Sequence, residues 1–426
     1  MLIKKILSVI SVLLSLVSCT SNQVTNEADY SPYLSTKIDS SKLLEDVNFW
    51  TDRIEKSSSA YTYLVKRANA HTKVFSTTGN IDYLIKAEQD LIEANKIVKD
   101  SDAGLLKNLA SNYITQHRFK EALELLLKAK TNGENLKGTK KMLFDVHLEL
   151  GNYIYAESYL KDLKNTSDFD YLIRSAKWED HIGNLEGAIL QMEKATAIAE
   201  SSNLKGIKQW AYTNLADFYG HAGKIDKSYT YFLKALALDP NDAYAKKGIA
   251  WIIYSHEKNP KEALSILNHI TSYYNSPDYD LLKAEIAEYT NNGDLKSKAL
   301  ASYTNAVKNA QYGEMYNKYN VALYSEDLSQ PELALEIAKR EIENRPTPQS
   351  YDLLAWSYFK TGDVKKANDI IEAHVEGQTS EPDVLYHIAK IYKAAGKTDK
   401  VAPIKQELIG SLYELGPNMA TKINQL

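Results

Sequence analysis

Small side chains recur along the chain at an interval of about 34 residues, and this period constrains the fold more than any other feature of the sequence. The recurring positions are Ala87, Ala122, Ala156, Ala188, Ser228, Ala263, Ala299, Ala334, Ala367 and, with a slightly larger residue, Val401. Successive members lie 32 to 40 residues apart. A small residue where two helices cross lets their axes approach closely. The sequence therefore predicts stacked pairs of helices, each interval holding one pair.

Three units carry a fuller pattern around these positions. The first has Leu215, Ala216, Tyr219, Gly223, Phe232, Ala235 and Pro240; the second has Leu354, Ala355, Tyr358, Gly362 and Ala367; the third has Leu109, Ala110, Tyr113, Ala122 and Ala129. The pattern resembles the tetratricopeptide repeat. In the third unit His117 stands where that family usually has glycine. The resemblance implies an all-α protein, a right-handed α-solenoid of about ten helix pairs over residues 61–415.

The composition agrees with a globular helical chain that has no affinity for polyanions. Apolar residues make up 44% and charged residues 25% of the 426 positions, which is typical of folded proteins. The formal net charge is −4 and the sequence has no basic runs. Nucleic acid is therefore not an expected partner, because its binding depends on clustered lysine and arginine.

The first eighteen residues are interpreted as a signal peptide that leads to a lipid anchor. Lys4 and Lys5 precede an apolar stretch of twelve residues, 6–17, which is too short for a bilayer span of roughly 20. Residues 16–19 resemble the lipobox of bacterial lipoproteins, and Cys19 is the only cysteine in the chain. The resemblance implies acyl chains on Cys19 and attachment to the cell envelope. Thr20, rather than aspartate, follows the cysteine and favours the outer membrane of a Gram-negative bacterium.

The segments on either side of the array have distinct predicted roles. Residues 19–41 are rich in Ser, Thr, Asn and Asp and lack apolar spacing, so we predict the lipidated cysteine followed by a flexible tether. Residues 42–60 are predicted to form an N-terminal capping helix. At the other end, 408–416 is predicted to cap the last pair and 416–426 to form a tail, because terminal repeats must shield the final face of a solenoid.

The concave groove is the candidate binding site. In tetratricopeptide proteins the first helix of each unit lines this groove, and the resemblance places a set of aromatic residues and lysines there. The set consists of Trp210, Tyr244, Lys247, Trp251, Tyr254, Lys283, Tyr316, Tyr319, Trp356 and Phe359, with Lys107 and Lys141 at equivalent lysine positions. Aromatic side chains suit the apolar groups of a peptide or the faces of sugar rings. An alternative interpretation is that some of them pack between units. The asparagine that the family's carboxylate clamp requires is replaced by residues such as Asp217 and Trp251, so a free C-terminal carboxylate is not the expected ligand.

No motif for catalysis, metal binding or a cofactor stands out. The stretch "GENLKGTK" at 133–140 has the wrong residue order and a preceding helix, so it does not fit a phosphate-binding loop. His117, His147, His181, His221 and His256 occur one per repeat, and we interpret them as turn residues rather than metal ligands, because their places within the repeat differ. We therefore expect no enzyme activity, no metal and no cofactor.

The sequence thus predicts a membrane-anchored scaffold or adaptor that binds another envelope protein through its groove. One alternative is a carbohydrate-binding component of an uptake or cell-wall assembly, which the same aromatic residues would serve. The other is an enzyme that uses a groove carboxylate such as Asp217.

Overall fold

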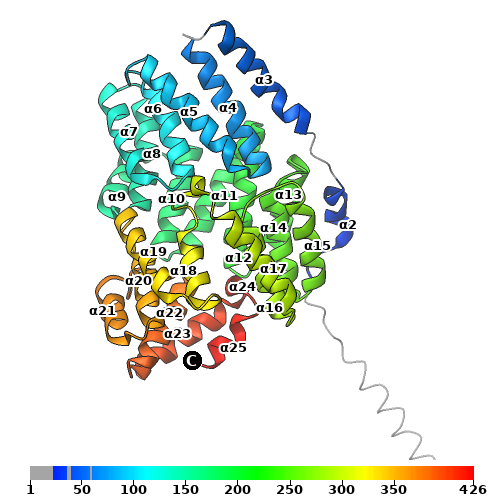
Figure 1. The fold of residues 1–426 in the computed structure, drawn as a ribbon, viewed down its shortest axis with the longest axis vertical. Coiled ribbons are helices and arrows are strands. Elements are labelled where there is room, and N and C mark those ends of the chain that lie inside the picture. The colour runs from blue at the N-terminus through cyan, green and yellow to red at the C-terminus, as the bar shows by residue number, and fades with distance from the viewer. Residues whose placement is uncertain (1–22, 36–39, 58–59) are drawn as a thin grey trace, which may run out of the picture.

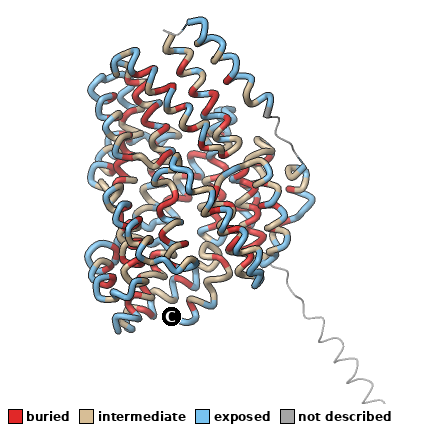
Figure 2. The backbone as a smooth tube through the Cα atoms, in the orientation of Figure 1, coloured by how far each residue is buried: buried red, intermediate tan, exposed pale blue. Residues whose placement is uncertain are grey.

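The computed structural model describes residues 23–35, 40–57 and 60–426. Within these ranges its regular secondary structure consists of helices joined by turns and loops, with no strand (Figure 1). The predicted all-α solenoid is confirmed. Ten helix pairs follow one another along the chain, as the period indicated. Buried residues concentrate where helices pack against each other, and exposed residues cover their outer sides (Figure 2).

The first helices of the ten pairs are α4 (Tyr61–Thr78), α6 (Ala103–Thr115), α8 (Leu136–Glu149), α10 (Phe169–His181), α12 (Lys205–His221), α14 (Ala243–Trp251), α16 (Asp278–Tyr289), α18 (Asn317–Glu326), α20 (Pro348–Lys360) and α22 (Pro382–Ala394). The second helices are α5 (Ile81–Ile97), α7 (Phe119–Asn132), α9 (Tyr153–Asp162), α11 (Leu185–Ser202), α13 (Ile225–Leu238), α15 (Pro260–Thr271), α17 (Gly293–Ala306), α19 (Pro331–Asn344), α21 (Val364–His374) and α23 (Thr398–Gly410). Helix α14 continues as the π-helix η3 (Ile252–His256), and a short 3₁₀ turn, η4 (Ala310–Tyr312), precedes α18. Helix α3 (Ser40–Lys56) packs on α4 at the start of the array.

The small residues that define the period are buried at the contacts between paired helices. Ala87, Ala122, Ala156 and Ala188 have no exposed surface, and the later members of the series are also buried. Axes at this close approach leave no space for a larger side chain. The period therefore marks helix crossings, as predicted.

Most turns between paired helices contain one residue in the left-handed region, which glycine adopts at the lowest cost. Gly223 supplies it between α12 and α13 with φ +69°. His117 holds the same conformation between α6 and α7 with φ +58°, and its ring stacks on Phe119 at 5.6 Å between ring centroids. At this turn His117 therefore stands in place of the family's usual glycine. Its left-handed backbone is strained, but its ring contacts Phe119.

The array winds into a closed superhelix, so that turns of the chain about 196 residues apart touch each other. The Asn275 amide donates a hydrogen bond to the Thr78 carbonyl at 2.7 Å, and Arg345 contacts Glu149 at 3.2 Å. Gly151 lies against the Pro346 carbonyl, and Gly183 lies against Ser380. These four contacts, which we call the inter-turn seam, all join residues 195 to 197 positions apart.

The segment 23–35 is docked on the outside of the array, which corrects the prediction of a flexible tether for this part of 19–41. It contains α2 (Glu27–Tyr30) and η2 (Ser31–Leu34). The amides of Val24 and Thr25 donate to Glu257 Oε1 at 2.8 and 2.6 Å, and Tyr30 is buried in the core around α13 and α15. A segment too polar to fold alone can still dock on helices formed by distant residues, which composition does not reveal.

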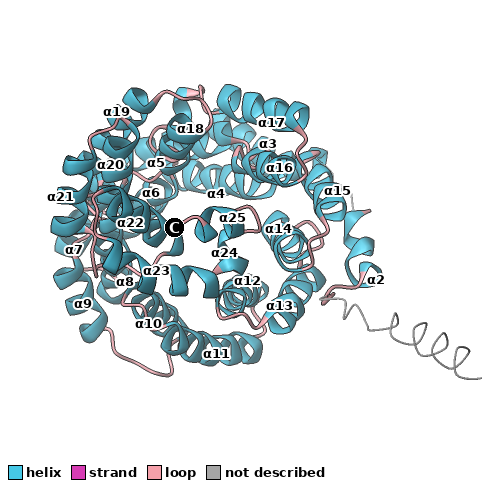
Figure 3. Cartoon of the chain, turned by 90° about the horizontal axis from the view of Figure 1, so that it is seen from below, coloured by secondary structure: helices cyan, strands magenta, loops and turns pink. Residues whose placement is uncertain are grey.

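The C-terminal segment, residues 411–426, also differs from the prediction. Residues 408–416 were expected to cap the last pair, but α24 (Leu412–Leu415) and α25 (Met419–Asn424) turn back into the interior of the ring (Figure 3). Helix α24 contacts α12, η3 and α22, and α25 contacts α23. The segment therefore packs on the last helix pair, as a cap would, and also covers part of the concave face, which was not predicted.

Candidate functional site

The first helices of the pairs line the interior of the superhelix and the second helices form its outer wall. Viewed along the axis of the superhelix, α12, α14 and α16 face the centre, whereas α13, α15 and α17 lie outside them (Figure 3). Each first helix packs against the second helix of its own unit, and several also contact the first helix of the next unit, for example α18 with α20 and α20 with α22. This arrangement places the predicted groove positions of α12 to α20 on or near the concave surface.

The predicted groove residues divide into three groups by exposure. Trp210, Tyr244 and Tyr319 are exposed, Tyr244 by 51% and Tyr319 by 42%. Lys247, Trp251, Lys283 and Phe359 are partly buried. Tyr254, Tyr316 and Trp356 are buried.

The three buried aromatic residues pack between units, as the alternative interpretation held. Tyr254 lies edge-on to Tyr289, with ring centroids 5.7 Å apart. Trp356 stacks on His387 at 4.0 Å and donates a hydrogen bond to Glu326 at 3.1 Å. These side chains stabilise contacts between repeats, so the accessible part of the predicted set is limited to the exposed and partly buried members.

A cavity of about 430 Å³, which we call the central cavity, lies where α12, α14, α18 and α24 meet. It is lined by Asp217, Gly220, His221, Ser228, Phe232, Tyr244, Lys247, Gly248, Trp251, Tyr319, Tyr413 and Glu414. Four predicted groove residues, Tyr244, Lys247, Trp251 and Tyr319, therefore come together at one place. Tyr413 and Glu414 belong to the C-terminal segment and were not predicted.

The central cavity combines aromatic walls with acidic groups. The Tyr244 hydroxyl donates to Asp217 Oδ2 at 2.5 Å, and burial raises the pKa of Asp217 to about 6 despite this hydrogen bond. Burial also raises the pKa of Glu414, whose carboxylate lies 4.0 Å from His221 Nδ1. At Asp217 the effect of burial outweighs the attraction of the nearby His221 and Lys247 side chains. The cavity therefore favours apolar groups and cations over anions.

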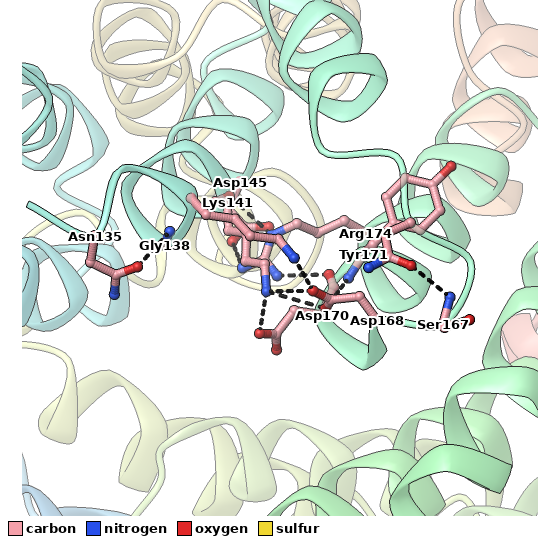
Figure 4. Close-up of polar contacts among 11 residues, drawn as sticks. Asn135, Gly138, Lys141, Asp145, Ser167, Asp168, Asp170, Tyr171 and Arg174 are labelled. Atoms are coloured by element: carbon pink, nitrogen blue, oxygen red, sulfur yellow. Dashed lines mark hydrogen bonds and ion pairs between the residues drawn. The ribbon is translucent and has the colours of Figure 1, made fainter. Parts of the chain in front are cut away.

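Two of the groove lysines, Lys141 and Lys247, are engaged by carboxylates of the following repeat, whereas Lys283 lies 3.6 Å from Asp280 of its own helix. Lys141 Nζ lies 3.2 Å from Asp168 and 2.6 Å from Asp170 (Figure 4). Asp168 also caps α10 by accepting the Tyr171 amide; burial raises its pKa, but hydrogen bonds from Lys137 and Lys141 lower it to about 2. Lys247 repeats the arrangement with Asp278 at 2.9 Å. Lys141 and Lys247 join neighbouring units, so their charge is already balanced at the groove surface.

A second cavity of about 380 Å³ lies between α16, α18, α20 and the C-terminal segment. Its lining includes Glu285, Glu288, Lys296, Trp356, His387, Leu415, Asn418, Met419 and Lys422. The C-terminal segment thus separates two cavities of the concave face. The spacing of Leu412, Leu415, Met419 and Ile423 is typical of an amphipathic helix, but it does not indicate that the segment packs on the concave face.

Three of the five turn histidines, His117, His147 and His181, pack against aromatic rings. Ring centroids are 5.1 Å apart for His147 and Tyr155, and 4.2 Å apart for His181 and Tyr153. Burial lowers the pKa of each of these imidazoles. Among the residues that the structure describes, no three His, Cys, Asp or Glu side chains form a group that could hold a metal ion.

Two predictions concern the membrane. Cys19 and the signal peptide lie outside the described residues. None of the helices in the described part of the chain combines the length and apolar character that a bilayer crossing requires.

Comparison with known proteins identifies the repeat type. Residues 211–242, which include most of α12 and all of α13, match the family model of the tetratricopeptide repeat. The predicted resemblance is therefore confirmed for this unit, and the other helix pairs share its architecture. No curated protein sequence matches the chain.

Solved structures with a similar arrangement of helices are distant in sequence. A tetratricopeptide repeat protein from Parabacteroides merdae is 16% identical with a TM-score of 0.39, over 59% of this chain and 94% of that one. YrrB, a tetratricopeptide protein with an unusual peptide-binding site, is 20% identical with a TM-score of 0.28, over 46% and 95%. A human IFIT1 dimer solved with PPP-AAAA is 13% identical with a TM-score of 0.47, over 76% of each chain.

Proposed function

We propose that this tetratricopeptide-repeat chain is a scaffold that binds a segment of another protein on its concave face, at the central cavity. The observation that carries the proposal is the convergence of Tyr244, Trp251 and Tyr319 on one cavity in the interior of the ring. Aromatic side chains in a concave site supply most of the binding energy in many interfaces. The tetratricopeptide architecture, which is used widely for protein–protein contacts, supports the same conclusion.

The charge of the cavity supports a polypeptide partner over a nucleic acid. Asp217 and Glu414 both line it, and the side chain of Lys247 is already paired with Asp278. Phosphate groups would be repelled there, because binding of nucleic acid relies on uncompensated cations.

We also propose that the chain is a lipoprotein of the cell envelope, held by acyl chains on Cys19, in the outer membrane of a Gram-negative bacterium. The docked segment 23–35 limits how far such an anchor would reach. Four peptide links separate Cys19 from Gln23 and span at most about 14 Å. The membrane would therefore lie close to the edge formed by α13 and α15, with the partner drawn from the envelope. A Cys19→Ala variant should move from the membrane fraction to the aqueous fraction; retention in the membrane would refute the anchor.

The binding proposal is tested by crosslinking in the native cell followed by mass spectrometry. The variant is Tyr244→Ala with Tyr319→Ala, because both side chains are exposed at the cavity. The matched control is Tyr155→Ala, since Tyr155 is 62% exposed on the outer helix α9. We expect a defined envelope protein to crosslink with the wild type and the control, and its yield to fall at least tenfold with the double variant.

Equal crosslinking by all three chains would show that the partner binds elsewhere. If no protein crosslinks but purified envelope glycan binds the wild type and not the double variant, the carbohydrate-binding alternative replaces the proposal. The exposed rings beside the Asp217 carboxyl group would then stack on and hydrogen-bond to a sugar.

A further inference from the structure

The C-terminal segment, residues 411–426, occupies the concave face in the way a bound peptide would (Figure 3). Its central contact is the Tyr413 carbonyl, which accepts hydrogen bonds from Trp251 Nε1 at 3.1 Å and from Ser255 Oγ at 2.6 Å. Both donors come from the junction of α14 with η3. A π-helical turn at this point is unusual and such turns are frequent at functional sites.

The remainder of the segment adds two polar contacts on the concave face and an apolar anchor, and Lys393 and Lys405 of the last helix pair donate to the carbonyls of Gln425 and Asn424. Asn418 Nδ2 donates to the Glu285 carbonyl at 2.9 Å, and Lys422 Nζ lies 3.9 Å from Glu288 Oε1. Ile423 is buried in the core formed by the last helices. Only Gly416 and Ile423 are fully buried in the segment; the other residues retain exposed surface. Leu412, Leu415, Met419 and Leu426 pack against the same core, so the segment is anchored on the last helix pair and meets the concave face through a few polar contacts.

The fit between the segment and the groove is incomplete. The central cavity borders it at Tyr413, and the second cavity borders it at Met419. Beneath Gly416, the Glu285 side chain carries a buried oxygen, Oε1, that has no hydrogen-bond partner among the residues that the structure describes. A buried acceptor without a donor is unfavourable, and a ligand that supplied the donor would gain its hydrogen bond.

We propose that residues 411–426 are an internal ligand of the concave site, and that the external partner is a protein segment that displaces them. The partner would present a backbone carbonyl to Trp251 and Ser255 and a lysine or arginine side chain to Glu285 and Glu288. This inference rests on the proposed function, because it concerns the same concave face. It specifies the chemical groups that the partner presents, and it states that residues 411–426 compete with the partner for the concave site.

Competition of this kind lowers the apparent affinity of the partner. A ligand that needs an open site binds in proportion to the fraction of molecules in which the site is open. A change that weakens docking of the internal segment, without altering the groove, should therefore increase binding.

Gly416→Ala is such a change. Gly416 has φ +80°, and an added Cβ would collide with Glu285 Oε1. The matched control is Gly377→Ala, because Gly377 has φ +70° and no atom within 4 Å of an added Cβ. A second variant, Lys422→Glu, reverses the charge that faces Glu288. All three substitutions leave the residues of the first helices unchanged.

The probe is a fluorescein-labelled peptide with the sequence of residues 411–426, titrated with the purified full chain and followed by anisotropy. Hydrogen–deuterium exchange of the same residues reports how firmly the internal segment is docked. We expect Gly416→Ala and Lys422→Glu to lose protection in 411–426 and to bind the peptide at least tenfold more tightly than the wild type and Gly377→Ala.

The partner chemistry is tested with two altered peptides bound to the Gly416→Ala chain. Asn418→Lys in the peptide brings a cation to Glu285 and should strengthen binding at least threefold, whereas Asn418→Gln, which is long but neutral, should not. Equal binding of both altered peptides would overturn the assignment of a cationic partner.

Loss of protection without a gain in peptide binding would overturn the internal ligand. Unchanged protection in both variants would show that 411–426 is a fixed part of the fold and would overturn it as well. Neither result affects the proposed function, because the crosslinking experiment depends on Tyr244 and Tyr319 and uses the partner itself.

Discussion

Replacement of Gly79 by alanine tests the contact between successive turns of the superhelix. Gly79 ends α4 with φ +67°, and its neighbour Thr78 accepts the Asn275 amide from the next turn. An added Cβ would lie 3.0 Å from the Asn275 nitrogen and 3.2 Å from the Ser276 nitrogen. Both atoms belong to the backbone, so neither can rotate away from the methyl group.

The expected cost has two parts. A non-glycine residue in the left-handed region costs roughly 1 to 2 kcal/mol. Crowding of a packed contact adds about 1 to 3 kcal/mol. Gly133→Ala isolates the first part, because Gly133 ends α7 with φ +82° and has no atom within 4 Å of an added Cβ. The difference between the two variants, about 1 to 3 kcal/mol, is therefore the cost of crowding the seam at this contact.

Hydrogen–deuterium exchange at the Asn275 amide measures this difference locally, since a long repeat array need not unfold in a single step. A loss of 1 to 3 kcal/mol corresponds to exchange faster by about 5-fold to 150-fold in Gly79→Ala. Gly133→Ala should leave this amide as it is in the wild type. Equal exchange at Asn275 in the two variants would show that the turns touch without stabilising each other.

Three further predictions concern other parts of the chain. Trp356→Ala should lower the free energy of unfolding by about 3 to 5 kcal/mol, because Trp356 is buried. Trp210→Ala, which removes an exposed ring, should change it by less than about 1 kcal/mol. Urea unfolding of the two variants tests this difference. Burial raises the pKa of Glu285 to about 7; the Tyr254 hydroxyl and Lys422 oppose this rise, and Glu288 reinforces it. The stability that protonated Glu285 provides is therefore present below pH 4.5 and is lost as the pH rises to about 7. Glu285→Gln should remove this dependence, measured as the midpoint of unfolding between pH 5 and 8, and an unchanged profile would contradict it. Glu257→Ala should release the segment that begins at Val24 and raise the exchange of the Thr25 amide, and an exchange rate equal to that of the wild type would refute its role.

The sequence predicted the repeated architecture because its determinants are local and periodic. Ala122 and Ala156 had to be small for their helices to cross, and both are buried at the crossings. The aromatic set could be placed only approximately. Tyr244 and Trp356 occupy groove positions in different repeats, yet one ring is exposed and the other is buried against His387. The rotation of each first helix and the size of its neighbours decide this difference, and a repeat pattern encodes neither.

The two terminal segments could not be predicted because their structure depends on distant residues. The polar residues of 23–35 are ordered by Glu257, about 230 positions away, and the Tyr413 carbonyl is held by Trp251 and Ser255, about 160 positions away. Tyr413 and Glu414 thereby become part of the central cavity. Such contacts leave no period in the sequence, so they become visible only in the folded chain.

The constant spacing of the inter-turn seam has a consequence for how this chain can change in evolution or by engineering. Repeat arrays in which each unit touches only its neighbours can gain or lose single units with little penalty. Here Thr78, Glu149 and Gly183 each meet a partner 196 or 197 residues further on. Deletion of one unit between them would offset every later partner by a whole repeat at once. The number of repeats in each turn is therefore fixed by the circumference of the superhelix, and repeats can be gained or lost only at the two ends.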